Sequence, residues 1–336
     1  MGYVMTEIFG TLGPACAQAD LLEKMFLEGM TGMRLNLSHT SLNESEDFIR
    51  NFQLAAQRAG VRPELLIDMQ GPEVRIGALS APLQLKESEE VVFAGQQETQ
   101  PQAGVIPAEH QVLSALETGD RVLLDDGKLE LMITAIKPQI RARVLQGGVL
   151  HSRKSLKIVD KRISGPVMTV QDRENLRLAK SYGVTALMQP FVTTGMQLSE
   201  VKNVLSEYGM EHIRIFAKIE NREGMEHIRD IIPHADMVVI ARGDLGNDMP
   251  LWELPAAQKT LSEICRKEGR PFLVVTQLLA SMIHHPYPTR AEVSDIFHAV
   301  VDGASAVMVT NETAVGKYPV EVIRYLKKTA QEAERY

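Results

Sequence analysis

Several residue types are scarce in this sequence. Its 336 residues include only two cysteines, Cys16 and Cys265. Two distant cysteines form neither a disulfide framework nor a cysteine-based metal site, so a reducing, cytoplasmic location is the simplest prediction. No apolar run approaches the roughly 18 residues that a membrane span needs, and no apolar leader opens the chain. These absences argue against secreted disulfide-rich proteins and membrane-spanning proteins.

Positive charge is also in short supply. The chain has 36 Lys and Arg residues against 43 Asp and Glu residues, a formal net charge of −7. This balance argues against nucleic acid or an anionic membrane as the main partner. It leaves a phosphorylated small molecule open, because phosphate binding needs a few local cations rather than a basic protein.

What the sequence does contain is an alternation of short apolar strands and amphipathic helices. Eight strands are predicted, at 7–10, 33–37, 65–69, 186–189, 213–219, 237–241, 271–275 and 306–309. Their apolar character suits a parallel sheet that is covered on both faces. Eight repeats favour an α/β fold with a closed (β/α)8 TIM barrel, with an open doubly wound sheet as the alternative.

Capping boxes indicate where two of the helices begin. Ser41–Glu44 and Thr169–Asp172 each place a hydroxyl three residues before a carboxylate, which is the pattern that satisfies first-turn amides.

One segment interrupts the alternation. Between about 77 and 156 the helical period is lost, and short alternating runs are separated by turns such as Gly147-Gly148. We therefore expect a barrel domain formed by residues 1–76 and 157–336. Residues 77–156 are expected to form a small all-β domain inserted after the third barrel strand.

Polar side chains cluster where the predicted strands end, which is where barrel enzymes place their reacting groups. Lys218 and Glu220 lie two residues apart on a strand and therefore point to the same face. Glu220 and Asp244 come from neighbouring strands and could together bind a hard cation such as Mg²⁺ or Mn²⁺.

Other residues at these ends suit phosphoryl chemistry. Arg34, Arg75 and Lys218 supply positive charge for a phosphoryl group. Gly243 leaves backbone amides open at a helix start, and the Thr276 hydroxyl can pass a proton. Structural ion pairs, such as Lys218 with Glu220, are the alternative interpretation of the charged residues.

Six motifs resemble the signature blocks of the pyruvate kinase family and occur in the same order. They are GTLGPA at 10–15, MRLNLSH at 33–39, GPEVR at 71–75, KIEN at 218–221, ARGDLG at 241–246 and PTRAE at 288–292. The segments Asp302-Gly303 and Asn311-Glu312-Thr313 extend the resemblance, which covers nearly the whole chain and is looser in the inserted β domain.

The resemblance implies a role for particular residues around the metal ions. Lys218 would neutralise the transferred phosphoryl group and the enolate oxygen, while Glu220 and Asp244 would hold Mg²⁺ or Mn²⁺. A K⁺ ion would be bound by Asn36, Ser38, Asp68 and the carbonyl of Met69. Glu73 stands where the K⁺-dependent members of the family carry a glutamate.

It also implies the groups that contact substrates. Arg34 would grip the phosphate of phosphoenolpyruvate, Gly243 and Asp244 would contact the same substrate, and Thr276 would lie in the proton path to the enolate carbon. The inserted β domain would close over ADP or ATP as a lid. The residues facing that nucleotide would be Asn36, His39, Arg75 and Lys154.

Departures from the family pattern fall near these groups. Met69-Gln70 replaces Thr-Lys, Pro190 replaces a serine, and Ala280 replaces a glutamate. The chain ends with the last predicted barrel helix, so the family's C-terminal domain is not expected in it.

The function implied by the resemblance is phosphoryl transfer between phosphoenolpyruvate and ADP to give pyruvate and ATP, a step of glycolysis. The departures keep two alternatives open: a metal-dependent enzyme that uses a pyruvate enolate without a nucleotide, such as a lyase or aldolase, and a non-catalytic nucleotide- or metabolite-binding relative. Small molecules are the expected partners, and a homodimer follows by analogy with the family only.

Overall fold

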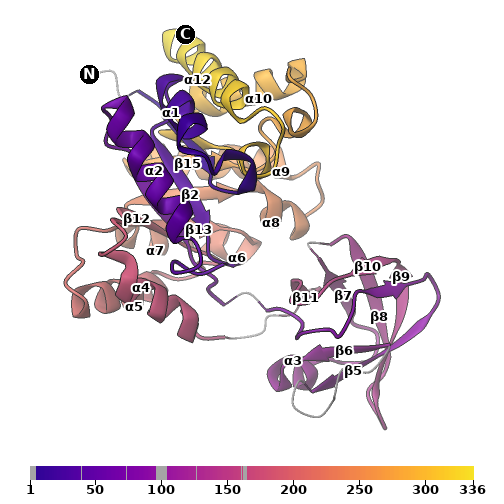
Figure 1. Ribbon diagram of the computed structural model, residues 1–336. Coiled ribbons are helices and arrows are strands. Elements are labelled where there is room, and N and C mark those ends of the chain that lie inside the picture. Colours follow the sequence, from indigo (N-terminus) through magenta and orange to yellow (C-terminus); the bar gives the residue numbers. More distant parts are fainter. Residues whose placement is uncertain are drawn as a thin grey trace. The chain divides into compact units, whose positions relative to one another are not determined.

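A computed structural model describes residues 5–38, 40–72, 74–95, 104–125, 127–159, 161 and 165–336. The chain divides into two compact units (Figure 1): Met1–Gly71 with Val167–Tyr336, and Pro72–Pro166. The domain boundaries predicted from the sequence, after residues 76 and 156, both fall inside the second unit. None of the described helices is long and apolar enough to cross a membrane.

The first unit is a closed barrel of eight parallel strands, which confirms the predicted (β/α)8 TIM barrel. Each strand predicted from the sequence overlaps one of the strands observed. In barrel order they are β1 (Glu7–Thr11), β16 (Ala306–Met308), β15 (Phe272–Val275), β14 (Met237–Ala241), β13 (Arg214–Ile219), β12 (Ala186–Gln189), β3 (Glu64–Asp68) and β2 (Gly32–Asn36).

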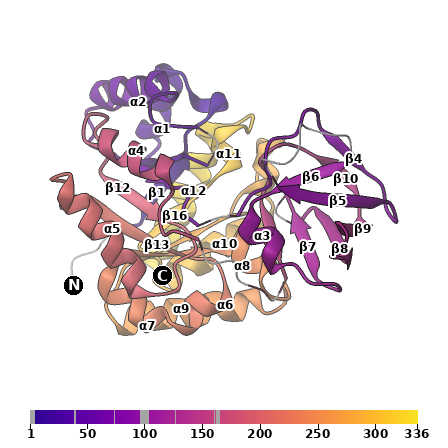
Figure 2. The ribbon, with the colours of Figure 1, turned by 90° about the horizontal axis from the view of Figure 1, so that it is seen from below.

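Helices surround the barrel strands on the outside (Figures 1 and 2). They are α1 (Ala19–Leu27), α2 (Glu46–Ala59), α4 (Val170–Ala179), α5 (Gly195–Glu207), α6 (Arg222–Glu226), α7 (Ile228–Ile231), α8 (Arg242–Asn247), α9 (Leu254–Lys267), α10 (Arg290–Val301), α11 (Asn311–Ala314) and α12 (Pro319–Arg335). Three 3₁₀ turns join them: η1 (Pro14–Cys16), η2 (Ile232–His234) and η3 (Ala280–Ile283). Helix α1 packs against α2, and α10 packs against α12.

The alternation of side chains along each strand produces two cores. Ile8 packs with the helices, whereas its neighbour Phe9 belongs to a separate cluster with Phe216 and Met188 from other strands. The rings of Phe9 and Phe216 meet edge to face, with centroids 6.3 Å apart. Successive strand residues point to opposite faces, so one side of each strand fills the barrel and the other holds the helices.

Two capping boxes were predicted, and only one of them begins a helix. Thr169 accepts a hydrogen bond from the backbone N–H of Asp172, and the Asp172 carboxylate accepts one in return at the start of α4. Ser41 and Glu44 exchange the same kind of bonds, but they do so in a turn, and α2 begins only at Glu46. The prediction of a helix start at Ser41 was wrong.

The second unit is mainly β-structure with a core of its own. The strands are β4 (Leu83–Leu85), β5 (Glu90–Gly95), β6 (Val105–Ala108), β7 (Arg121–Leu124), β8 (Leu129–Ala135), β9 (Ile140–Gln146), β10 (Gly148–Leu150) and β11 (Leu156–Ile158). The larger sheet has the order β11-β7-β8-β9-β5-β6, in which β5 and β6 pair in parallel, and β10 pairs with β4. A short helix, α3 (His110–Ala115), was not expected from the sequence.

Candidate active site

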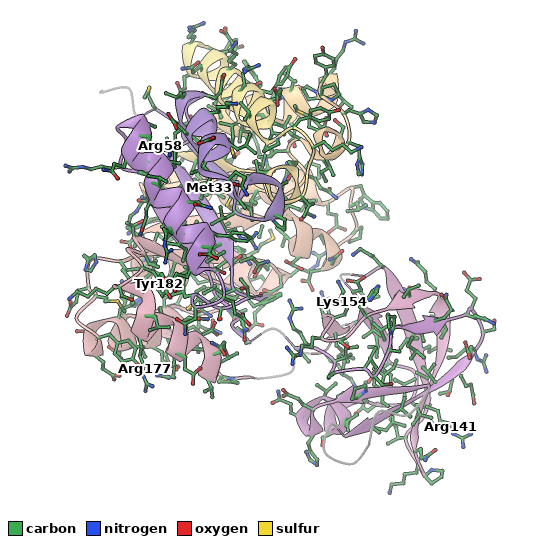
Figure 3. The ribbon with its side chains drawn as sticks, in the orientation of Figure 1. Met33, Arg58, Arg141, Lys154, Arg177 and Tyr182 are labelled. Atoms are coloured by element: carbon green, nitrogen blue, oxygen red, sulfur yellow. The ribbon has the colours of Figure 1, made fainter. Side chains whose placement is uncertain are left out.

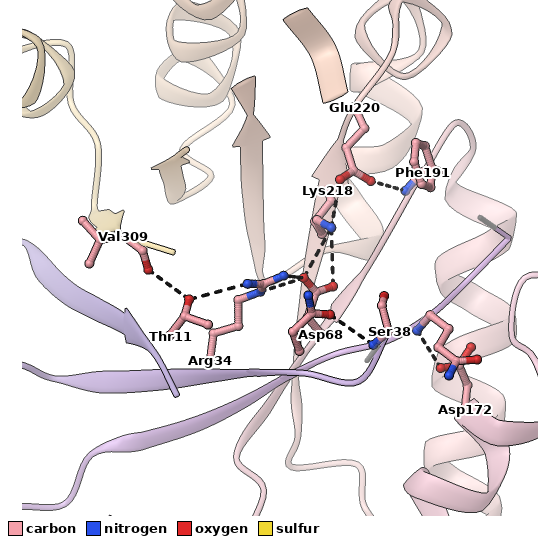
Figure 4. Close-up of polar contacts among 11 residues, drawn as sticks. Thr11, Arg34, Ser38, Asp68, Asp172, Phe191, Lys218, Glu220 and Val309 are labelled. Carbon is pink, nitrogen blue, oxygen red and sulfur yellow. Dashed lines mark hydrogen bonds and ion pairs between the residues drawn. The ribbon is translucent and has the colours of Figure 1, made fainter. Parts of the chain in front are cut away.

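Buried charged side chains meet at the carboxyl ends of β2, β3 and β13 (Figure 4). Arg34 donates to Asp68 Oδ2 from Nε at 2.8 Å and lies 2.7 Å from it through Nη2. Lys218 Nζ lies 3.4 Å from the Asp68 carboxylate and 2.8 Å from Glu220 Oε1. Asp68 therefore joins the two cations that were predicted to face a phosphoryl group.

Because these side chains are largely shielded from water, the pKa of each one depends strongly on the charges of its neighbours. The side chains of Asp68 and Glu220 are 3% and 1% exposed, and that of Lys218 is 14% exposed. Burial lowers the pKa of Lys218, but the charges of Asp68 and Glu220 outweigh it, and the net pKa is raised above that of an ordinary lysine. Lys218 is thus held as an ammonium ion at neutral pH.

Asp68 is held in its charged form by the same contacts. Burial raises the pKa of its carboxyl, but the charges of Lys218 and Arg34 lower it by more, so the pKa lies below its ordinary value. A charged carboxylate only accepts hydrogen bonds, so Asp68 orients the donor groups of both Arg34 and Lys218 toward itself.

The two oxygens of Glu220 have different surroundings. Oε2 accepts a hydrogen bond from the backbone N–H of Phe191 at 2.7 Å. Oε1 is buried and pairs with the Lys218 ammonium, whose Nζ lies 2.8 Å away. Phe191, which donates the bond to Oε2, has a left-handed backbone with φ of 50°.

Asp244 contributes negative charge to this group of residues. It lies in the first turn of α8, after β14, and its carboxylate is among the charges that raise the pKa of Lys218. Arg34 and Lys218 both contact Asp68, Lys218 also contacts Glu220, and Asp244 is a third carboxylate whose charge acts on Lys218. In the part of the chain that the structure describes, no three His, Cys, Asp or Glu side chains form a ready-made metal cluster.

The residues predicted to bind K⁺ lie around the ends of β2 and β3. Ser38 donates its backbone N–H to Asn36 Oδ1 at 3.1 Å, and Leu37 donates to the carbonyl of Asp68 at 2.9 Å. Met69 follows Asp68 directly and is buried. The structure brings the four predicted residues into one region.

A buried aspartate that the sequence offered only as a helix cap also shapes this region. Asp172 accepts hydrogen bonds from the backbone N–H groups of Gln70 at 2.8 Å and Gly71 at 3.0 Å. The Gln70 side chain donates to the carbonyl of Leu37 at 3.1 Å. Helix α4 thereby fixes the loop after β3, and through Gln70 the loop after β2.

Thr276, which directly follows β15, lies beside Gly243 of α8. A Cβ atom built on Gly243 would lie 3.1 Å from Thr276 Cγ2 and 3.5 Å from its Oγ1. Glycine at 243 therefore leaves room for the threonine side chain over the start of α8.

The remaining predicted residues belong to the second unit or lie outside the described residues. Arg75 pairs with Ser155 in a β-bridge and donates to the carbonyl of Arg153 at 2.8 Å. Lys154, labelled in Figure 3, lies 2.9 Å from Asp125. His39 and Glu73 fall outside the described residues.

Comparison with known proteins gives consistent matches. A family model described as pyruvate kinase, barrel domain, matches residues 3–323. The pyruvate kinase of Geobacillus stearothermophilus is 35% identical over 334 residues, which cover 98% of this chain and 57% of that protein. That of Aeropyrum pernix is 36% identical over 329 residues, 97% of this chain and 70% of the relative.

The match extends along both units of the chain. The pyruvate kinase of Methylorubrum extorquens is 35% identical over 335 residues, and this chain spans 69% of its length. The family model, described as a barrel domain, agrees with the eight-stranded barrel of the first unit. The chain belongs to the pyruvate kinase family.

Proposed function

We propose that the protein transfers a phosphoryl group from phosphoenolpyruvate to ADP, giving pyruvate and ATP. The observation that supports this most directly is the buried ammonium of Lys218, which is kept charged by Asp68 and Glu220 at the mouth of the barrel. A fixed positive charge in a buried site stabilises the negative charge that develops during phosphoryl transfer.

The proposed reaction has two steps. The bond between phosphorus and the enol oxygen breaks while a bond forms between phosphorus and a terminal oxygen of ADP, and the enolate leaves with the electron pair. A proton then adds to the terminal carbon of the enolate, whose oxygen becomes the carbonyl of pyruvate. Lys218 would neutralise the oxygens on which charge develops.

Arg34 is suited to binding the phosphate. Its guanidinium is held by Asp68 through Nε and Nη2, which fixes the plane of the group. A guanidinium fixed in this way binds phosphate oxygens with defined geometry. Thr276 would supply the hydroxyl that passes the proton, and the backbone at Gly243 would contact the substrate carboxylate.

The carboxylates fit a divalent cation. Glu220 is buried, with Oε1 beside the Lys218 ammonium, and the charge of the Asp244 carboxylate also acts on Lys218, so the carboxylates of two neighbouring strand ends lie close to the proposed phosphoryl site. Glu220 and Asp244 would hold Mg²⁺ or Mn²⁺, which prefer oxygen ligands. When bound, the ion would supply positive charge to the oxygens of the phosphoryl group.

The donor set around β2 and β3 also fits K⁺. An amide oxygen, a hydroxyl, a carboxylate and a backbone carbonyl, from Asn36, Ser38, Asp68 and Met69, are the oxygen ligands that such an ion accepts. The nucleotide contacts of Asn36, His39, Arg75 and Lys154, and the role of the β unit as a lid, stay predictions.

An assay of pyruvate and ATP formation from phosphoenolpyruvate and ADP, with Mg²⁺ and K⁺, tests the proposal. Lys218→Met should lower kcat/KM by roughly 100-fold or more, equivalent to ~3 kcal/mol of lost transition-state stabilisation. Lys259→Met is the control, because Lys259 pairs with Asp302 on the outside of the barrel. Equal rates for wild type and Lys218→Met would rule out the proposed role of the lysine.

A second function is favoured by the hydrogen bonds of Gln70. Its neutral side chain contacts Leu37 and Thr169 and so brings no positive charge to the loop after β3. An enzyme that uses a pyruvate enolate without a nucleotide needs less positive charge there. Metal-dependent turnover of a 2-oxo acid in the absence of ADP and ATP would identify it. Ligand binding by calorimetry without any turnover would instead indicate a non-catalytic relative.

A further inference from the structure

Two consecutive residues after β15 have unfavourable backbone conformations. Thr276 has φ of 81° and Gln277 has φ of 58°. The left-handed region disfavours any side chain, and a β-branched residue such as threonine is an outlier in it. Such a conformation persists only where surrounding contacts hold it, and such residues are frequent at active sites.

The contacts that hold Thr276 come from Arg242, the first residue of α8. Arg242 donates to the Thr276 carbonyl from Nη2 at 2.6 Å and from Nε at 3.2 Å. Two donors of one planar group on a single oxygen fix the orientation of that peptide. The Arg242 side chain is only 11% exposed, so water competes little for these bonds.

The other side of the guanidinium is held by two further helices. Nη1 lies 2.7 Å from Asp295 Oδ2 and donates to Oδ1 at 2.9 Å, on α10. The same nitrogen donates to Gln258 Oε1 on α9 at 3.3 Å. Arg242 is therefore fixed at both edges, and Asp295 supplies the charge that pairs with it.

The position of the Thr276 side chain depends on this arrangement. Its Cγ2 and Oγ1 lie beside the backbone of Gly243, one residue before Asp244. A return of Thr276 to an ordinary extended backbone would rotate its side chain relative to the carbonyl that Arg242 holds. Neither Arg242 nor Asp295 needs to touch the substrate to control where the hydroxyl points.

We propose that Arg242 and Asp295 are positioning residues, which hold Thr276 in its left-handed conformation so that its hydroxyl passes the proton to the enolate carbon. This inference rests on the proposed function. The hydroxyl gives its proton to the terminal carbon and regains one from solvent. The carbon–carbon double bond supplies the electron pair of the new C–H bond, and the enolate oxygen becomes the carbonyl.

The test separates proton transfer from phosphoryl transfer. Proton transfer is followed by NMR, as exchange of the methyl hydrogens of pyruvate for deuterium in D₂O with ATP, Mg²⁺ and K⁺ present. Phosphoryl transfer is followed as ATP formation from phosphoenolpyruvate and ADP. Arg242→Gln should slow methyl exchange by about 10-fold or more beyond its effect on ATP formation, since a well-placed proton donor contributes 10²–10⁴-fold.

Three further variants sharpen the comparison. Asp295→Asn should also slow methyl exchange more than ATP formation, but to a smaller extent than Arg242→Gln. Arg242→Lys should recover part of the methyl exchange rate, because it keeps the positive charge and one donor. Arg324→Gln is the control, since Arg324 on α12 forms an ion pair with Glu28, the residue that follows α1. If Arg242→Gln slows both steps equally, or slows neither, the inference is wrong.

Failure of the proposed function gives a different result. In that case the wild-type protein itself forms no ATP. The inference that Arg242 holds the backbone of Thr276 is then tested by hydrogen exchange of the backbone amides at 276–279. Faster exchange there in Arg242→Gln than in Arg324→Gln supports the role of Arg242 in holding Thr276. Unchanged exchange overturns it.

Discussion

Asp68 is the residue on which the two cations of the candidate site depend. Arg34 and Lys218 both contact it, and its side chain is 3% exposed. Asp68→Asn keeps the shape but removes the charge, so both cations lose a buried partner. We expect a loss of unfolding free energy of about 3–5 kcal/mol, as for other broken buried ion pairs, measured by urea unfolding at pH 7.

A suitable control is Asp20→Asn, which removes a carboxylate whose side chain is 86% exposed and which pairs with Arg58. That change should cost no more than about 1 kcal/mol. A loss for Asp68→Asn as small as this would show that Arg34 and Lys218 find other partners.

The dependence of stability on pH follows from the lowered pKa of Asp68. Burial raises this pKa, but Lys218 and Arg34 lower it by more. The stabilisation from the charged form is therefore fully present above the unfolded-state pKa, about 3.9, and is lost as the pH falls through the lower folded-state pKa. The stability difference between wild type and Asp68→Asn should shrink below pH ~4. Urea midpoints for both proteins from pH 7 to pH 3 would measure it, and a constant difference would contradict it.

At the scale of elements, close packing between β1 and β2 depends on a glycine. A Cβ atom on Gly32 would lie 2.4 Å from Phe9 Cε1 and 3.0 Å from the carbonyl of Glu64. Phe9 fills the barrel interior and cannot move without disturbing Phe216. Gly32→Ala should therefore destabilise the protein by about 1–3 kcal/mol in thermal or urea unfolding.

Gly246→Ala is the matched substitution, because a Cβ there would make only ordinary contacts of 3.4 Å with Leu251 and Leu254. It lies inside α8, where alanine is the better helix former. If both glycine substitutions had the same effect, the close contact with Phe9 would not be the cause.

Elements whose signals are local could be predicted from the sequence. The strands of the barrel follow from short apolar runs, and the box at Thr169 begins α4 as expected. The box at Ser41 was misleading because Ser41 and Glu44 make the same bonds in a turn. Helix α3 was missed because it has only six residues and lies among alternating strands.

The shape of the candidate site could be predicted only in part. The charges of Lys218 and Glu220 stand out in an apolar strand, so their meeting was predictable. The left-handed backbones of Phe191 and Thr276 were not, because nothing in a phenylalanine or threonine indicates positive φ. They depend on tertiary contacts with Glu220 and Arg242, from other strands and helices.

At the scale of the whole molecule, each unit has its own hydrophobic core. The barrel contains two clusters, and the described part of the second unit contains a separate one that includes Leu131, Val122 and Ile106. Residues of the second unit connect to the barrel sequence only near 71–72 and 166–167. A unit with its own core is able to unfold without the rest of the chain.

Because the two units have separate cores, a cavity made by a Leu→Ala substitution in one core should destabilise that unit and not the other. Leu131 lies in the middle of β8 and is fully buried, so Leu131→Ala should cost the second unit about 2–5 kcal/mol. Hydrogen exchange followed by mass spectrometry should show faster exchange in β7, β8 and β9, while β13 and β14 keep the protection they have in wild type. Leu273→Ala, a change of the same size inside the barrel, should produce the reverse pattern. If Leu131→Ala weakened protection equally in both units, the two cores would unfold as one cooperative structure, and loss of the β unit would always accompany loss of the barrel.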